Sequence, residues 1–408
     1  MNLENKDNGR CKVCNSGKMY KFLSLGETPL ANRFLKKEEL NEKEAYYPLD
    51  VYFCEECFFV QIGCLVNPKI LFDNYVYVSS TSETLKKQFK GLAEDVKGRI
   101  KEDSFIVEIA SNDGTMLKNF NGYKILGIEP ASNIVKIAVD NGIPTLNKFF
   151  NIDAAKEIVK KYGKAHAIIG TNIFAHIPDL NNFIKAIKIL LDKDGFVVFE
   201  SPYLIDFIEN MEFDTIYHEH IYYLSLKPLV NLFEKHGMAL FDVKRTKMHG
   251  GSIRFFVGNA KFDKEKSVTG LMSLEEKFGI DKRKTYEEFA FKVLKLKIKL
   301  KDLLNHLKTS GKSIIGYGAP AKGNTLLNYV GIGDEILDYI VDNNSLKQGL
   351  YTPGKKIPVF SPDKILKKRP DYMLILAWNF ANEIMEHQKG YKESGGKFII
   401  PIPEPKII

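Results

Sequence analysis

The sequence has no uninterrupted apolar segment of the roughly 18 residues that a membrane-spanning helix needs. Its first residues, Met1–Lys6, lack the apolar core of a secretory signal peptide. Lysines and arginines are scattered along the chain and do not form a dense basic run interleaved with aromatic residues. These three absences predict a cytoplasmic protein that binds neither membranes nor nucleic acid.

The chain has 408 residues, of which 44% are hydrophobic and 27% charged, an ordinary composition for a globular protein. This length predicts two or three domains. The net charge of +8 suits an anionic ligand such as a nucleotide diphosphate, although most of the excess is expected on solvated surface. We expect a monomer.

Cysteine is scarce, and four of the five cysteines form two CxxC pairs, Cys11 with Cys14 and Cys54 with Cys57. Without a secretory signal, two such pairs predict a tetrahedral four-thiolate zinc site that stabilises the fold and does not catalyse. The alternative is a redox-active dithiol, which usually needs only one CxxC pair. The fifth cysteine, Cys64, is expected to be a buried free thiol.

Residues 72–82 are rich in hydroxyl groups and follow the cysteine-bearing region. They are expected to lead into a helix that begins near Glu83, and Ser80 or Ser82 can cap that helix. The same hydroxyls can alternatively line a substrate. The residues predicted for that role are Tyr75, Tyr77 and Ser79.

Strands and helices alternate from about Phe105 onward, which predicts a doubly wound α/β sheet with ligand contacts at the carboxyl ends of its strands. The predicted strands are 104–110, 123–128, 165–170 and 195–200. A helix at 227–236 and an antiparallel pair, 239–246 and 252–258, are expected to close the sheet. This closure is typical of methyltransferases and not of dehydrogenases.

The turn after the first predicted strand contains a single glycine, so it lacks the GxGxxG fingerprint of dinucleotide-binding folds. Its acidic residues, Glu108 and Asp113, would repel a pyrophosphate and attract a cationic sulfonium with an amino group. Glu129 ends the next strand, where an acid can hold both hydroxyls of a ribose. These features predict an S-adenosylmethionine site. The expected cofactor contacts are Glu108, Ala110, Asn112, Asp113, Gly114, Glu129, Pro130 and Asn172.

The stretch Phe213–Ser225 concentrates groups that can exchange protons or hydrogen-bond to a polyol. It contains Tyr217, His218, Glu219, His220, Tyr222 and Tyr223. Histidine has the unperturbed pKa closest to neutral pH, so we predict catalytic groups here, although a polar turn with solvated or metal-binding histidines would look similar. His176, after the 165–170 strand, either joins the substrate site or packs against Pro178.

Residues 271–309 have the periodicity of one or two lysine- and glutamate-rich helices that join domains. Strand–helix alternation then restarts, with strands predicted at 312–316, 337–341 and 372–377. The turn 317–324 can bind phosphate through backbone N–H groups and Lys322 before a helix at 325–330. The alternative is a vestigial scaffold, left by duplication, that binds no ligand.

Five segments together resemble the S-adenosylmethionine-dependent sugar C-methyltransferases that act on nucleotide-linked 4-keto deoxysugars. They are the four-cysteine region, Glu108–Gly114, Tyr217–His220, His249–Arg254 and Gly316–Gly323. The resemblance covers nearly the whole chain and implies an α/β fold of three parts. These are a zinc-binding domain (1–80), a class I methyltransferase domain (81–262), and a helical linker with a smaller Rossmann-like domain that binds the nucleotide sugar (263–408).

The resemblance also implies roles for single residues. His220 is the base that removes the C-3 proton next to the ketone, Glu219 and Tyr217 share its loop, and His176 or Tyr222 is a candidate donor to the enolate oxygen. The resemblance implies substrate contacts at Tyr75 or Tyr77 and at Lys322, and the further predicted substrate contacts are Ser79, His218, His249, Arg254 and Asn324. The implied partner is a dTDP-, GDP- or CDP-linked 4-keto sugar, and the implied cofactors are S-adenosylmethionine and a structural Zn²⁺ ion.

Three other functions remain open at this point. One is an O- or N-methyltransferase on the same scaffold, which the position of a transferred label would distinguish. Another is a nicotinamide-dependent sugar oxidoreductase, against which the acidic single-glycine turn argues. The third is a non-enzymatic zinc adaptor, which would not bind S-adenosylmethionine.

Overall fold

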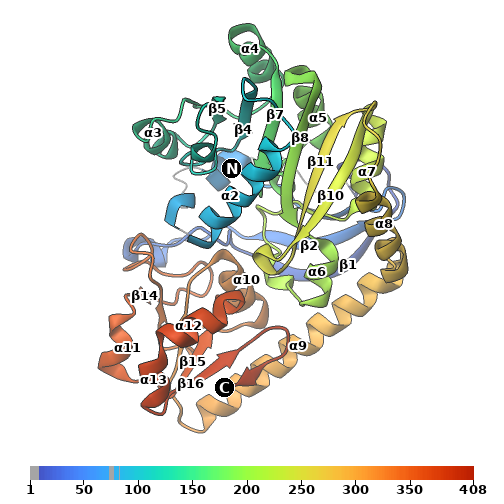
Figure 1. Cartoon of the computed structure of the whole chain (residues 1–408). Helices are drawn as coiled ribbons and strands as arrows, with labels where there is room; N and C mark the ends of the chain where they lie inside the picture. The colour runs from blue at the N-terminus through green and yellow to red at the C-terminus, as the bar shows by residue number, and fades with distance from the viewer. Residues whose placement is uncertain (1–8, 73–77, 82) are drawn as a thin grey trace.

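The computed structural model describes residues 9–72, 78–81 and 83–408. Within these ranges the strands form three sheets, of four, seven and six strands. We name them the N-terminal, central and C-terminal sheets after the regions that supply most of their strands (Figure 1). The predicted α/β architecture is confirmed.

The N-terminal sheet combines strands that are far apart in the sequence. Its antiparallel order is β1 (Met19–Thr28), β2 (Tyr47–Cys54), β3 (Val60–Ile62) and β9 (Tyr222–Tyr223). The first three strands follow one another in the chain, whereas β9 comes shortly after His220. Val60 pairs with Tyr223 and Gln61 with Tyr222. The loop predicted to be catalytic is therefore joined to the sheet that carries the cysteine pairs.

The central sheet is mainly parallel. Its order is β10 (Met238–Thr246), β11 (Ser252–Asn259), β8 (Leu191–Pro202), β7 (Ala165–Thr171), β4 (Phe105–Ile109), β5 (Lys124–Ile128) and β6 (Thr145–Leu146). The five strands from β8 to β6 are parallel neighbours, and β11 is antiparallel to β8 and β10. The sequence predicts each strand except β6, whose two residues are too few to show a period.

Helices cover both faces of the central sheet, as parallel strands require. They are α2 (Glu83–Lys97), α3 (Ser132–Asp140), α4 (Ile152–Tyr162), α5 (Leu180–Leu190), α6 (Leu204–Glu209) and α7 (Leu226–Lys235). Along β4, Phe105 and Val107 share an apolar cluster with α4 and α5, whereas Ile106 shares one with Leu92 of α2. Because neighbouring strands run parallel, the polar residues that follow their carboxyl ends meet at one edge of the sheet.

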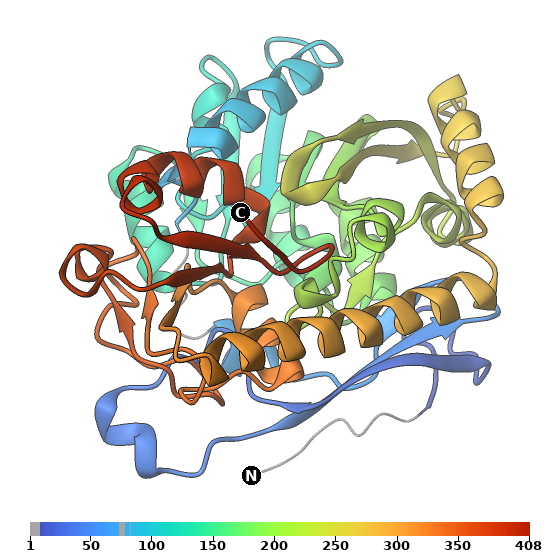
Figure 2. The ribbon, with the colours of Figure 1, turned by 90° about the horizontal axis from the view of Figure 1, so that it is seen from below.

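Two helices, α8 (Lys266–Phe278) and α9 (Arg283–Thr309), form the segment with lysine- and glutamate-rich periodicity, as predicted. The longer helix, α9, lies along β1 and leads into the C-terminal sheet (Figure 2). Its buried residues recur at helical spacing, among them Tyr286, Val293 and Leu300. Its charged side chains can therefore remain on the solvent-facing side.

The C-terminal sheet is parallel except for its last strand. Its order is β14 (Val359–Phe360), β13 (Ile340–Val341), β12 (Ile314–Tyr317), β15 (Tyr372–Ile375), β16 (Lys397–Ile400) and β17 (Lys406–Ile407). Its helices are α10 (Ala321–Val330), α11 (Asp363–Lys368), α12 (Ala381–His387) and α13 (Lys389–Glu393). Because α10 begins at Ala321 and not near residue 325, Lys322 lies in its first turn.

Short helical turns connect these elements and hold several predicted site residues. They are α1 (Pro68–Phe72), η1 (Lys37–Asn41), η2 (Ser79–Thr81), η3 (Leu117–Asn119), η4 (Phe174–His176), η5 (Phe213–Thr215), η6 (Met248–Gly250) and η7 (Trp378–Phe380). Among the described residues, no helix is both long enough and apolar enough to cross a membrane.

Candidate active site

A cavity of about 1540 Å³ opens where the carboxyl ends of β4, β5, β7 and β8 meet. The residues that line the cavity come from the regions of all three sheets. They include Asn32 near β1, Glu129 after β5 and Lys322 on α10. Pockets for one drug-sized ligand usually hold roughly 300–1,000 Å³. The volume therefore accommodates a cofactor together with a second substrate.

The backbone at the cavity edge is unusual after two neighbouring strands. Ala110 and Asn112, after β4, have φ of 55° and 48°, and Asn172, after β7, has φ of 55°. Positive φ is uncommon for residues other than glycine and concentrates at functional sites. All three residues line the cavity, and their contact with the cofactor stays a prediction.

Glu129 is held rigidly at this edge. Its Oε2 accepts a hydrogen bond from the Asn112 N–H at 3.1 Å, and its Oε1 accepts one from the Ala131 N–H at 2.9 Å. Burial raises the pKa of the Glu129 carboxyl above its ordinary value, and the hydrogen bonds from the two N–H groups reduce this rise. Each carboxylate oxygen retains a further lone pair, so the group fits a ligand with two neighbouring hydroxyls.

Glu108 presents a buried acid to the same cavity. It is 2% exposed, and its Oε2 has no hydrogen-bond partner in the described part of the chain. Burial raises its pKa well above the usual range, and the charges of Asp113 and Glu129 add to this effect. An unpartnered buried carboxyl is costly unless a ligand supplies a donor or a cation, and the amino group of S-adenosylmethionine fits that need.

Asp113 and Gly114, predicted to contact the cofactor, do not line the cavity. The Asp113 carboxylate accepts hydrogen bonds from the Ser80 N–H at 3.0 Å and the Thr115 hydroxyl at 2.6 Å. A Cβ on Gly114 would lie 2.7 Å from the Ile143 side chain. Both residues therefore shape the turn after β4, and the cofactor prediction for them is corrected.

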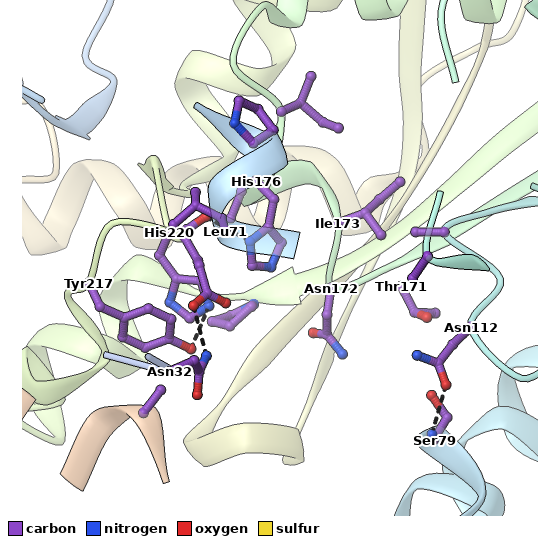
Figure 3. Close-up of a pocket in the computed structure, with 18 of the residues that line it drawn as sticks. Asn32, Leu71, Ser79, Asn112, Thr171, Asn172, Ile173, His176, Tyr217 and His220 are labelled. Atoms are coloured by element: carbon purple, nitrogen blue, oxygen red, sulfur yellow. Dashed lines mark hydrogen bonds between the residues drawn. The ribbon is translucent and has the colours of Figure 1, made fainter. Parts of the chain in front are cut away.

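The Tyr217–His220 loop lies across the cavity from this turn (Figure 3). His220 Nδ1 is 2.8 Å from the Thr215 carbonyl oxygen, which can only accept, so this nitrogen carries a proton. In the neutral ring Nε2 is then the basic nitrogen, and it accepts from the Tyr217 hydroxyl at 2.9 Å. The two ring centroids are 4.1 Å apart. His220 thus presents an unprotonated Nε2 that accepts a hydrogen bond from Tyr217.

Glu219 and His176 complete this group. Burial raises the Glu219 pKa to about 7, although the hydrogen bond from Asn32 lowers it. The His176 ring lies 5.0 Å from the His220 ring, and its Nδ1 donates to the Glu219 carbonyl at 2.7 Å. Burial lowers the His176 pKa, while bonds to the Glu219 and Asn172 carbonyls oppose that effect. A neutral His176 therefore helps to hold the loop.

The side chains of two other residues of this stretch, Tyr222 and His218, contact backbone carbonyl groups of the fold. Tyr222 borders the cavity, but its hydroxyl donates to the Pro178 carbonyl at 3.3 Å, which does not match the predicted donor role. His218 is 2% exposed, does not line the cavity and has Nε2 3.3 Å from the Pro48 carbonyl oxygen. Burial lowers the His218 pKa to about 4. His218 is a neutral core residue, and its predicted substrate contact is corrected.

Arg254 and Asn324, predicted to contact substrate, also lie outside the cavity. Arg254 is 6% exposed, and its Nε donates to Glu200 Oε2 at 2.9 Å, while a second nitrogen pairs with Asp95. Asn324 is 1% exposed and donates to the Ala31 carbonyl at 2.7 Å. Both side chains are buried and lie outside the cavity, so the substrate predictions for them are corrected.

Ser79 and Lys322 do line the cavity. The Ser79 N–H donates to Asn112 Oδ1 at 2.9 Å (Figure 3), and the Lys322 ammonium lies 4.4 Å from the Trp378 ring centroid. Burial lowers the Lys322 pKa, while nearby acids oppose that effect. Tyr75 and Tyr77 fall outside the described residues, and no side-chain position is described for His249.

The four cysteines of the CxxC pairs come together in space. Their Sγ atoms all lie within 4.8 Å of one another, with Cys11 to Cys57 at 3.5 Å and Cys14 to Cys54 at 3.6 Å. Tetrahedral zinc with bonds of about 2.3 Å places its sulfurs about 3.8 Å apart, so the set fits a closed structural zinc site. Cys64, predicted to be buried, is partly exposed.

Comparison with known proteins gives a consistent result along the whole chain. Family models match residues 11–72 (a zinc binding domain), 82–243 (a methyltransferase domain) and 247–403 (a C-methyltransferase C-terminal domain). Over 404 residues the chain is 37% identical to the C-methyltransferase NovU of Streptomyces niveus, covering 98% of this chain and 96% of that protein. The chain belongs to the C-methyltransferase family.

This C-methyltransferase uses S-adenosylmethionine and carries a structural zinc site. The oxidoreductase and adaptor alternatives are thereby set aside. Solved structures that are similar in part include an S-adenosylmethionine-dependent methyltransferase from Anabaena variabilis. Its sequence identity to this chain is 15% and the TM-score is 0.37, and the match covers 46% of this chain and 89% of that chain. Another is the magnesium protoporphyrin IX methyltransferase of Synechocystis, with 9% identity, coverages of 42% and 81%, and a TM-score of 0.34.

Several cavity residues of the C-methyltransferase are not predicted from its sequence. Phe149, Phe150 and Asn151 line the cavity just after β6, and Asn32 lines it from the N-terminal region. A prediction of β6 would also have predicted the three residues that follow it, because residues after a parallel strand lie at the sheet edge where ligands bind. No local signal marks Asn32, whose place depends on long-range docking.

Proposed function

We propose that this C-methyltransferase methylates C-3 of a nucleotide-linked 4-keto deoxysugar, with His220 as the base. The observation that supports this most is the basic Nε2 of His220, held by Thr215 and Tyr217 within the cavity that receives the cofactor. A proton next to a ketone can be removed by a neutral imidazole if the enolate oxygen is stabilised. S-adenosylmethionine supplies an electrophilic methyl group on its sulfonium.

Tyr217 is the donor best placed for the enolate oxygen. Its hydroxyl donates to His220 Nε2, so it must leave that nitrogen when the substrate C–H group approaches. Once His220 carries the substrate proton, Nε2 can no longer accept a hydrogen bond. The Tyr217 O–H is then available to the oxygen on C-4. This coupling places the oxyanion donor and the base in one pair of residues.

The nucleotide end of the substrate is expected near α10. Lys322 lies in the first turn of that helix and borders the cavity. Helix N-termini and lysine ammonium groups both favour phosphate oxygens. A diphosphate bound there would place the sugar between Lys322 and the His220 loop, in a cavity with space for both ligands.

A labelling experiment tests the substrate and the methylated atom. The enzyme is incubated with methyl-labelled S-adenosylmethionine and dTDP-, GDP- or CDP-linked 4-keto sugars in parallel. We expect one sugar to gain a methyl group whose proton signal is a singlet, because C-3 has become quaternary. A doublet, or a label on oxygen or nitrogen, would contradict the proposed position.

Glu129→Gln is expected to weaken S-adenosylmethionine binding by about ten- to a hundredfold, since a hydrogen bond to a charged group contributes about 1.5–3 kcal/mol. The substitution keeps the volume of the side chain and removes its charge at the cavity edge. Isothermal titration calorimetry measures the effect, with the exposed Glu102→Gln as the matched control. An unchanged dissociation constant in Glu129→Gln would remove Glu129 from the cofactor site.

A further inference from the structure

A segment near the N-terminus reaches the catalytic loop from outside the central sheet. We name residues 29–35 the arm. Within it, Asn32 lines the cavity, and its Nδ2 donates to Glu219 Oε1 at 2.7 Å (Figure 3). The two residues are separated by 187 positions in the chain. The arm therefore supplies a direct contact to a carboxyl of the proposed active site.

The arm is held on both sides of Asn32 by the C-terminal region. Asn324 of α10 is buried and donates to the Ala31 carbonyl at 2.7 Å. Leu35 and Tyr351 exchange two backbone hydrogen bonds, each of 2.9 Å. These contacts leave Asn32 little freedom to turn away from Glu219. Its amide is thus placed by residues of the C-terminal region as well as by the turn that follows β1.

We propose that Asn32 is a positioning residue for the methyl transfer, and that Asn324 fixes it in place from the C-terminal region. Asn32 orients the Glu219 carboxyl and favours its ionised form through the Nδ2–H donor. The proposal rests on the function proposed above, because it assumes that the Tyr217–His220 loop performs the chemistry. It gives the C-terminal region a part in catalysis in addition to substrate binding.

The surroundings of Glu219 make this one hydrogen bond influential. The titratable residues next to Glu219 on its own loop include Tyr217, His218 and His220, and His176 approaches from η4 to bond the Glu219 carbonyl. Burial raises the Glu219 pKa to about 7, and the Asn32 amide opposes that rise. A carboxyl with a pKa near neutrality changes its charge with small changes in its contacts. Loss of the Asn32 donor should therefore protonate Glu219 over a wider pH range.

The test is a ¹³C NMR titration of the Glu219 carboxyl in the full-length protein, with the signal assigned by its loss in Glu219→Gln. Asn32→Ala is expected to raise the Glu219 pKa above its value in the unaltered protein. It should also lower kcat at neutral pH by about tenfold and leave the KM for S-adenosylmethionine unchanged. The pH limb of kcat that follows Glu219 should move to higher pH by the same amount.

Two further variants separate positioning from a general loss of structure. Asn32→Asp keeps the shape and replaces the donor with an acceptor, so it should raise the Glu219 pKa further still. Asn324→Ala should raise it less, by loosening the arm. The matched control is Asn328→Ala, since Asn328 lies on the same helix but donates to Pro353 and Asn324 carbonyls within the C-terminal region.

The outcomes are distinct from those of the labelling experiment. An unchanged Glu219 titration in both Asn32→Ala and Asn32→Asp would overturn the positioning role, whichever atom receives the methyl group. Equal shifts in Asn328→Ala and Asn324→Ala would overturn the role of Asn324. A shifted titration together with methylation away from C-3 would contradict only the proposed function.

Discussion

His220→Asn is expected to lower turnover by about 10²–10⁴-fold, the usual contribution of a positioned general base. Asparagine can still donate an N–H toward the Thr215 carbonyl, but it offers no basic nitrogen in place of Nε2. S-adenosylmethionine binding should be unchanged, because the Glu108 and Glu129 side of the cavity keeps its hydrogen bonds. Initial rates and calorimetry measure the two effects separately.

Hydrogen exchange isolates the step assigned to His220. With the accepted sugar in deuterated water and no methyl donor, the unaltered enzyme should exchange the C-3 proton, and His220→Asn should not. The exposed His387→Asn, outside the cavity, is the matched control for loss of an imidazole. Near-normal turnover or C-3 exchange in His220→Asn would rule out this residue as the base.

Cys54→Ser is expected to remove zinc, unfold the N-terminal sheet and abolish methyl transfer. Structural zinc contributes an apparent folding free energy of about 10–16 kcal/mol in zinc-finger peptides. Here the effect should extend to the active site, because β3 pairs with β9 and the Ile62 N–H donates to the Ile221 carbonyl at 2.9 Å, next to His220. Loss of the sheet would release the Tyr217–His220 loop at its C-terminal end.

Metal analysis, thermal melting followed by circular dichroism, and the rate of methyl transfer measure the consequences of Cys54→Ser. Cys64→Ser serves as the control, since Cys64 is not one of the four clustered thiols. Chelation of zinc from the unaltered enzyme should reproduce the loss of activity and lower the melting temperature. A zinc-free enzyme that melts and turns over normally would show that the loop does not depend on the metal.

Much of the cavity edge at β4 and β5 could be predicted from local sequence pattern. Glu108, Asn112 and Glu129 lie on or next to two neighbouring parallel strands, and the carboxyl ends of such strands meet at one edge. Their approach therefore needs only the correct strand assignment. Asp113 and Gly114 share the same turn but face inward. Which residue of a tight turn faces the ligand depends on its backbone angles, and the sequence does not display them.

The Tyr217–His220 loop shows the same limit of sequence-based prediction more clearly. His218 and His220 are two positions apart, yet His218 is in the core beside Pro48 and His220 borders the cavity. Their residue types are identical, so composition cannot rank them. The concentration of titratable side chains predicted the loop as a site, and the resemblance to sugar C-methyltransferases implied His220 as the base. Whether Glu219 and His220 perform the chemistry is a question for the variants above.

The sequence alone determined the features that depend on residue type and short-range spacing. These include two CxxC pairs suited to one zinc ion, strand–helix alternation in two parts of the chain, and acids near the carboxyl ends of two strands that border the cavity. Only the tertiary structure decided that β9 completes the N-terminal sheet, that Arg254 pairs with Glu200, and that Asn32 reaches Glu219. Such contacts join segments far apart in the chain, and they depend on how whole elements dock, which no local period records.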